Sequence, residues 1–264
     1  MINVHLQENV HTHAQVVKRS EGRDVVTKAA YNSRSNLTNR NTKKNNYHRS
    51  KGGLLYETIL IPGDSPNWLE EMSKDREALW SAVEKREIRK DAQLARELDF
   101  GLLEELNDEQ NIALFVSFVQ RQFVDKGMVA DITIHEPPKG GDEKNIHGHT
   151  LLTMREATPS GFGLKVRAWN DRSLIRDARE AWCREANRCL EQNGFEPRLD
   201  HRSYKERNIE KEPTRYQGPT YRRSKEQSKE CDAPKGPIDV WQLLREAIAK
   251  ESDGRDNKGI EHEK

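Results

Sequence analysis

The chain has 264 residues, of which 34% are charged and 33% hydrophobic, and its formal net charge is only +1. This length allows one large domain or two small ones with a buried core, while the polar composition indicates that part of the chain is a solvated arm. No apolar run approaches the roughly 20 residues that span a bilayer, and the first residues lack a signal-peptide pattern, so the sequence predicts a cytoplasmic protein without membrane insertion.

The small net charge conceals a segregated distribution. Residues 1–53 carry ten Lys or Arg against three Asp or Glu, residues 64–111 carry seven against fourteen, and residues 201–225 carry eight against three. Two basic segments therefore flank an acidic one, and a phosphate backbone would be attracted to the basic pair. A solvated charged surface explains part of the same pattern.

The first third of the chain predicts a strand, a turn and a helix, followed by a polar loop and a second strand. Alternation after His11 indicates the strand, Gly22 the turn, and the run VVTKAAYNSR the helix, which carries Tyr31. Residues 36–53 are rich in Asn, Lys and Gly, which is typical of a mobile loop. LLYETILIP then has strand character and stops at Pro62.

Farther along, apolar residues recur at helical spacing from about Ser73 to Leu98, which predicts a long helix that leads into a strand. An amphipathic helix with Gly127 as its C-cap follows, then the strand VADITIH, a polar loop and the strand HGHTLLTM. Another helix is expected between Arg172 and Asn193.

An eleven-residue loop joins the two best strands, so they are expected to pair antiparallel. The sequence therefore predicts an α+β fold with a mainly antiparallel sheet and flanking helices. We expect this domain to cover residues 1–220 and a charged tail with one short helix to cover residues 221–264.

Three histidines form the strongest chemical pattern. His147 and His149 are two residues apart on a strand and so share one face, and in a hairpin His135 would lie opposite them. Three imidazoles could converge on one divalent ion with open coordination positions, as catalytic sites require. An isolated HxH is more often only a polar strand edge, but the third histidine favours a metal. Ligand type alone admits zinc, whereas imidazoles that face a phosphate suit manganese or magnesium equally well.

Three further residues are candidates for catalysis. Glu97 and Asp99 also stand two apart, so both carboxylates can face one side, orient a metal-bound histidine or accept a proton. Tyr31 is a candidate nucleophile because Lys28 and Arg34 give its phenol a positive environment. Taken singly, the carboxylates would be ordinary surface charges and the tyrosine a packing residue.

Several long segments, in the same order, also resemble a known family between about residues 14 and 219. They are KRSEGRDVVTKAAYNSR, YHRSKGGLLYETILIP, LWSAVEKREIRKDAQLARELDFGL, GMVADITIHEPPKGGDEKNIHGHTLLTMR, GFGLKVRAWN and RLDHRSYKERNIEKEPTRYQGP. The chain resembles the MobA/MobL relaxases, the MobQ-type mobilisation class of HUH endonucleases. It departs from the usual pattern at Asp99, where many relatives carry Glu, and at Ile146, where a proline is usual.

The resemblance implies a palm-like antiparallel sheet flanked by helices and a metal-dependent nickase that acts at a plasmid transfer origin (oriT). A tyrosine would attack the scissile phosphodiester, form a 5′-phosphotyrosyl link and later rejoin the ends. Carried over, the nucleophile is Tyr31, the metal ligands are His135, His147 and His149, and the acidic pair is Glu97 and Asp99. The implied ion is Mn²⁺ or Mg²⁺.

The implied partners are single-stranded DNA at the transfer origin, accessory relaxosome proteins and a type IV secretion coupling protein. The implied setting is conjugation in a bacterium, with a plasmid or mobile-element gene and a product that travels with the DNA. We expect the loop 36–53 and the segment 201–225 to hold the strand by charge and base stacking. The candidate DNA-binding residues are Arg34, Lys43, Lys44, Tyr47, Arg49, Lys51, Arg202 and Tyr204.

Three other functions fit some of these residues. A hydrolytic nuclease would use metal-bound water and leave Tyr31 as a packing residue. A protein that only caps or represses an origin would not need the histidines. A rolling-circle replication initiator shares the histidines and tyrosine, but the position of Tyr31 upstream of HxH favours a relaxase.

Overall fold

The structure is a computed structural model that describes residues 8–9, 11–46, 53–137 and 145–210. The described elements belong to the first of two compact units, Met1–Ile209. The predicted tail over 221–264 lies outside the described residues, as do Tyr47, Arg49 and Lys51. Among the described helices, none combines the length and the apolar character that a bilayer crossing needs.

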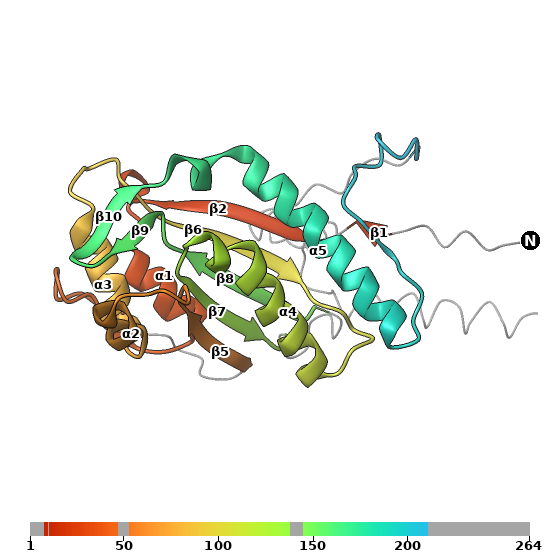
Figure 1. The fold of residues 1–264 in the computed structure, drawn as a ribbon, viewed down its shortest axis with the longest axis horizontal. Helices are drawn as coiled ribbons and strands as arrows, with labels where there is room; N and C mark the ends of the chain where they lie inside the picture. The colour runs from red at the N-terminus through yellow and green to blue at the C-terminus, as the bar shows by residue number, and fades with distance from the viewer. Residues whose placement is uncertain (1–7, 10, 47–52, 138–144, 211–264) are drawn as a thin grey trace, which may run out of the picture. The chain divides into compact units, whose positions relative to one another are not determined.

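A five-stranded sheet, antiparallel throughout, forms the centre of the fold (Figure 1). Its spatial order is β2-β6-β8-β7-β5, so most neighbours are distant in the sequence. The predicted α+β fold with an antiparallel sheet is confirmed, including the pairing of the two strands that carry the histidines. The strands are β2 (Thr12–Lys18), β5 (Leu54–Leu60), β6 (Gln93–Gly101), β7 (Ala130–His135) and β8 (His147–Leu152).

Helices cover both faces of this sheet. The helices α4 (Asp108–Gln122) and α5 (Arg172–Gln192) pack on one face, where Phe100 of β6 meets Phe115 and Trp182. On the other face, α1 (Val25–Asn32), α2 (Asn67–Ser73) and α3 (Arg76–Arg86) enclose a second apolar cluster around Trp80. Since side chains alternate along a strand, the odd-numbered positions of β6 near its end face α1.

The predicted helix over 73–98 is too long, although a helix does occupy part of the range and a strand does follow it. Two helices are separated at Lys74 and Asp75, because the Asp75 side chain accepts a hydrogen bond from the Ala78 amide and begins a new helix. The second helix ends at Arg86, and the chain from Gln93 forms β6. Residues 93–101 pair with β2 on one side and with β8 on the other. This pairing stabilises a strand there, although the apolar residues recur at helical spacing.

Short elements complete the described fold. The polar loop contains a small hairpin of β3 (Leu37–Thr38) and β4 (Asn45–Asn46). The prediction that Gly127 is the C-cap of the amphipathic helix is wrong: Phe123 is the C-cap of α4, and Gly127, with φ 95°, caps the 3₁₀ turn that follows. The others are the hairpin β9 (Arg155–Thr158) and β10 (Gly161–Lys165), the parallel pair β1 (Glu8–Asn9) and β11 (Leu199–Asp200), and the 3₁₀ turns Arg19–Glu21, Val124–Lys126 and Arg167–Asn170.

Candidate active site

His135, His147 and His149 lie together at one end of the sheet. The β7–β8 register places His135 opposite His147 and Thr133 opposite His149, so all three imidazoles project from the face that α1 covers. Their ring centroids are 5.3 Å apart for His135 and His147, 4.7 Å for His135 and His149, and 4.9 Å for His147 and His149. One nitrogen from each ring lies within 4.8 Å of the other two.

Each imidazole also makes one hydrogen bond that fixes its orientation. Nε2 of His135 donates to the Asn32 carbonyl oxygen at 2.6 Å, because a carbonyl only accepts. Nδ1 of His147 donates to the Asn145 carbonyl at 2.9 Å, and Nδ1 of His149 donates to Asp99 Oδ1 at 2.6 Å. The remaining nitrogen of each neutral ring keeps its lone pair, which is what a metal ligand needs. These three lone pairs fit one divalent ion with open positions.

Burial keeps two of these rings neutral. It lowers the pKa of His135 to about 3, although the hydrogen bond to Asn32 opposes the shift. Burial also lowers the pKa of His147. Burial alone would raise the pKa of Asp99, but the hydrogen bond and charge of His149, with the charge of Lys28, hold it below its usual value. At neutral pH the site therefore combines the uncharged rings of His135 and His147 with an ionised Asp99.

Glu97 occupies a different environment from Asp99, although both project from β6 toward α1. Its side chain is fully buried (0% exposed). Gln15 donates to one carboxylate oxygen, Asn32 Nδ2 donates to Oε1 at 2.9 Å, and Lys28 Nζ lies 2.7 Å from Oε2. Both oxygens of Glu97 are thus already engaged by protein donors, whereas Asp99 stays half-buried beside His149.

Helix α1 brings Tyr31 to this region. Tyr31 is 57% exposed, while the next residue, Asn32, is buried and contacts both His135 and Glu97. Lys28, one turn earlier, has its ammonium 5.2 Å from the centroid of the Tyr31 ring. An open hollow of about 340 Å³ lies beside the tyrosine. Its lining includes Gln15, Arg23, Asp24, Lys28, Tyr31 and Lys44.

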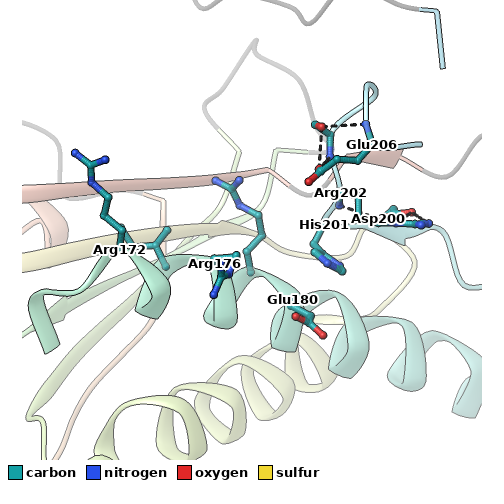
Figure 2. Close-up of a pocket in the computed structure, with 10 residues that line it drawn as sticks. Arg172, Arg176, Glu180, Asp200, His201, Arg202 and Glu206 are labelled. Atoms are coloured by element: carbon teal, nitrogen blue, oxygen red, sulfur yellow. Dashed lines mark hydrogen bonds and ion pairs between the residues drawn. The ribbon is translucent and has the colours of Figure 1, made fainter. Parts of the chain in front are cut away.

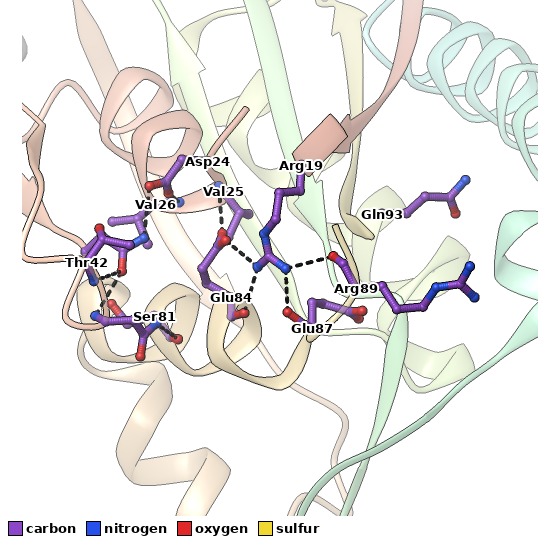
Figure 3. A network of polar contacts seen from close by, with 12 residues as sticks. Arg19, Asp24, Val25, Val26, Thr42, Ser81, Glu84, Glu87, Arg89 and Gln93 are labelled. Atoms are coloured by element: carbon purple, nitrogen blue, oxygen red, sulfur yellow. Dashed lines mark hydrogen bonds and ion pairs between the residues drawn. The ribbon is translucent and has the colours of Figure 1, made fainter. Parts of the chain in front are cut away.

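The first turn of α1 is anchored to α3 by a polar network (Figure 3). Asp24 accepts hydrogen bonds from the amides of Val26 and Thr27 as the N-cap of the helix. Glu84 of α3 accepts from the Val25 amide at 3.3 Å and from Arg19 at 2.6 Å. The helix that carries Tyr31 is therefore held at its first turn by α3 and at its last residue by His135 and Glu97.

The candidate DNA-binding residues fall in two places. Arg34, with φ 51°, follows α1 and its positive charge contributes to the lowered pKa of His135, so it lies beside the histidines. Lys43 and Lys44 lie on the β3–β4 hairpin, where Lys44 Nζ is 3.3 Å from Thr27 Oγ1 of α1. Lys44 also lines the hollow beside Tyr31.

Arg202 and Tyr204 lie apart from these three, after β11. Arg202 pairs with Asp200 at 2.7 Å and lines an open groove of about 590 Å³ together with arginines of α5 (Figure 2). Tyr204 lies under the Arg207 guanidinium, 5.1 Å from the ring centroid. The groove mixes these arginines with Glu180, Asp200 and Glu206, so its charge is mixed. The rest of the basic segment, residues 211–225, lies outside the described part of the chain.

Sequence reasoning missed three residues on which the site depends. Gln15 and Asn32 hold Glu97, and neither stands in a pattern that would single it out. Gly148 lies between two of the histidines, and a Cβ there would overlap the ring of Phe115 on the opposite face. In the sequence, Gly148 is visible only as the residue between two histidines, and nothing there shows that Phe115 packs against it.

Comparison with known proteins identifies a family for most of the chain. The model of the MobA/MobL family matches residues 23–227. A "Probable conjugal transfer protein TraA" from Sinorhizobium fredii is 37% identical over 235 residues, which cover 79% of this chain and 21% of the relative. A "Mobilization protein MobL" from Acidithiobacillus ferridurans is 31% identical over 239 residues, covering 79% of this chain and 61% of the relative.

A solved structure described as "Molecular Basis of Vancomycin Resistance Transfer in Staphylococcus aureus" has the same fold. Its TM-score is 0.66 at 30% sequence identity, and the match covers 75% of this chain and 100% of that one. The chain spans 21% of the length of the TraA proteins that it matches.

Proposed function

This chain belongs to the MobA/MobL family, and we propose that it nicks and rejoins one DNA strand at a transfer origin, with Tyr31 as the nucleophile. The names of its relatives, a conjugal transfer protein and a mobilization protein, support this process. The observation that carries the proposal is that Lys28 and Asn32, which flank Tyr31 on α1, reach the carboxylate of Glu97, while Asn32 also bonds to His135.

In the proposed reaction, the Tyr31 oxygen attacks the scissile phosphorus as its proton passes to water. The bond from phosphorus to the 3′ oxygen breaks, and that oxygen takes a proton from water. The product is a 5′-phosphotyrosyl adduct and a free 3′-OH, and the reverse attack by the 3′-OH rejoins the strand. Because the phosphotyrosyl bond retains the free energy of the broken phosphodiester, rejoining the strand requires no nucleoside triphosphate.

His135, His147 and His149 would hold a divalent ion, with Mn²⁺ or Mg²⁺ as the proposed species. When bound, such an ion offsets negative charge on the non-bridging oxygens of the phosphate. Asp99 orients His149 through the 2.6 Å hydrogen bond. Of the two carboxylates, we assign proton acceptance through water to Asp99, because it is half-buried, whereas Glu97 is fully buried.

The DNA would be single-stranded or melted at the nick. We propose that Arg34, Lys43 and Lys44 contact its phosphates beside Tyr31, and that Arg202 and Tyr204 contact it farther away. Roles for Tyr47, Arg49 and Lys51 stay predictions, because these residues lie outside the described part of the chain. Accessory relaxosome proteins and a coupling protein stay predictions as well.

The test is adduct formation on labelled single-stranded oligonucleotides that tile a candidate transfer origin, with Mn²⁺ or with EDTA. Label that co-migrates with the protein on a denaturing gel, requires the metal and disappears in Tyr31→Phe would support the proposal. Tyr56→Phe is the matched control, because Tyr56 is a half-buried tyrosine of β5 packed against the α4 side. Cleavage without an adduct would instead support a hydrolytic nuclease.

A further inference from the structure

Lys28 connects the exposed tyrosine to the most deeply buried carboxylate of the site. Its ammonium lies 2.7 Å from Glu97 Oε2 and 5.2 Å from the centre of the Tyr31 ring. Lys28 and Tyr31 are three residues apart on α1, so the helix itself aligns their side chains on one face. Among the described residues, Lys28 is the one lysine or arginine that forms an ion pair with Glu97.

The contacts of Glu97 explain why this ammonium stays in place. A fully buried carboxylate without a cation is strongly unfavourable, so the pairing with Glu97 restricts where the lysine can go. Gln15 and Asn32 fix the carboxylate from two other elements, β2 and α1. Glu97 is therefore a carboxylate held in place by its neighbours that anchors the Lys28 ammonium, rather than a group that exchanges a proton with Tyr31.

A cation over an aromatic ring interacts more strongly when the ring becomes more negative. During attack on phosphorus, the phenol loses its proton to water and negative charge spreads from the oxygen into the ring. The attraction between Lys28 and Tyr31 is thus greater in the transition state than in the resting phenol, which is the condition for accelerating a step. Lys28 remains an ammonium throughout and neither gives nor takes a proton.

We propose that Lys28 is a positioning residue for Tyr31. Glu97 holds the Lys28 ammonium in place, and Lys28 stabilises the developing phenolate and so sets the rate of adduct formation. The inference rests on the proposed function, because it assigns Tyr31 as the nucleophile. It assigns to the Lys28–Glu97 pair a role that is separate from metal binding by the three histidines.

The test is a double-mutant cycle measured by single-turnover adduct formation at saturating DNA and Mn²⁺. Its variants are Lys28→Met, Glu97→Gln and the pair combined, with Lys28→Arg as the conservative rescue. Lys28→Met keeps an unbranched stem of similar length, and Glu97→Gln removes the buried charge that Lys28→Met would leave unpaired. The combined variant therefore keeps the measurement possible if Lys28→Met alone unfolds.

We expect Lys28→Met to lower the adduct rate about 10²-fold, both in the otherwise wild-type protein and in the Glu97→Gln background. DNA affinity and Mn²⁺ affinity should stay unchanged, and Lys28→Arg should recover much of the rate. Lys74→Gln is the charge-matched control, because Lys74 is exposed and pairs with Glu71 at the end of α2.

Two results would overturn the inference. If Lys28→Met had no effect in the Glu97→Gln background, Lys28 would serve only as the counter-ion of Glu97. If the loss lay in DNA affinity and disappeared at saturating DNA, Lys28 would bind phosphate instead. In both cases the wild-type protein still forms the adduct, whereas failure of the proposed function would leave no adduct in the wild-type protein.

Discussion

The backbone carbonyl of Asn32 accepts a hydrogen bond from Nε2 of His135 at 2.6 Å, so the last residue of α1 is joined directly to the histidine cluster. The same residue donates its side-chain amide to Glu97 at 2.9 Å. Since Tyr31 directly precedes Asn32, the position of the proposed nucleophile depends on these two bonds.

Replacing Asn32 by alanine should weaken both the fold and the reaction. The backbone bond to His135 survives, but Glu97 loses one of its donors, which costs about 1–3 kcal/mol for a buried partner. We expect adduct formation to fall about 10- to 100-fold, because the Glu97 carboxylate that anchors Lys28 beside Tyr31 is then held less firmly. Denaturant unfolding and the single-turnover adduct rate measure the two effects.

The control is Asn107→Ala, which removes the N-cap of α4 on the other face of the sheet and costs a comparable stability of about 1 kcal/mol. It should leave the adduct rate unchanged. Equal losses of activity in both variants would mean that stability, rather than the position of α1, limits the reaction.

Gly148→Ala should destabilise the strand that carries His147 and His149. The added Cβ would overlap the Phe115 ring of α4, so either the helix or the strand must shift, at a cost of about 1–3 kcal/mol. We expect a lower Tm and weaker Mn²⁺ binding, with partial recovery in Gly148→Ala combined with Phe115→Leu.

Gly63→Ala provides the comparison, because no atom of the described residues lies within 4 Å of a Cβ at that position. It should leave Tm and Mn²⁺ affinity almost unchanged. A Gly148→Ala protein with unchanged stability would show that α4 does not constrain β8.

In EDTA, the stability of the protein should fall as the pH drops below about 6.5. Burial lowers the pKa of His135 to about 3, so between these values the unfolded chain binds a proton that the folded protein does not. Stability therefore rises with pH across this window, by at most about 1.4 kcal/mol per pH unit for this one group. The contribution of His135 is constant above the window.

Urea unfolding at several pH values, for the wild type and for His135→Gln, measures this dependence. The variant lacks the titrating group, so its stability should depend less steeply on pH between about 3 and 6.5. Parallel pH profiles for both proteins would contradict the assignment of His135 as a buried neutral imidazole.

The lysines of the β3–β4 hairpin should contribute to DNA affinity through charge. Lys43→Gln and Lys44→Gln should each weaken single-stranded DNA binding at low salt and reduce the slope of log K against log salt by about 1. Fluorescence anisotropy over a salt series measures both. Lys74→Gln should keep the wild-type slope, and an equal reduction in that variant would mean a non-specific charge effect.

The sequence was sufficient to predict the histidine cluster, because in an antiparallel hairpin the last residue of the first strand lies opposite the start of the second. His135 and His147 are paired in that register. The helix that carries Tyr31 was also predictable, from the turn at Gly22 and the apolar run after Asp24.

The sequence could not reveal how these parts combine. The order β2-β6-β8-β7-β5 joins strands far apart in the chain, and only this order brings Gln15 of β2 beside Glu97 of β6. The same non-local pairing explains why the end of the predicted helix over 73–98 belongs to β6. The local spacing of apolar residues there was compatible with a helix or a strand, and pairing with β2 and β8 stabilises the strand.

The central claim is tested most directly by identifying the residue that carries DNA. Trypsin cuts after Lys28 and Arg34, so the adduct formed with a short oligonucleotide should yield the peptide AAYNSR (residues 29–34), with Tyr31 as its single tyrosine. We predict that mass spectrometry finds the nucleotide mass on this peptide after reaction with Mn²⁺. Nucleotide mass on a peptide that contains a different tyrosine, with AAYNSR unmodified, would contradict the account.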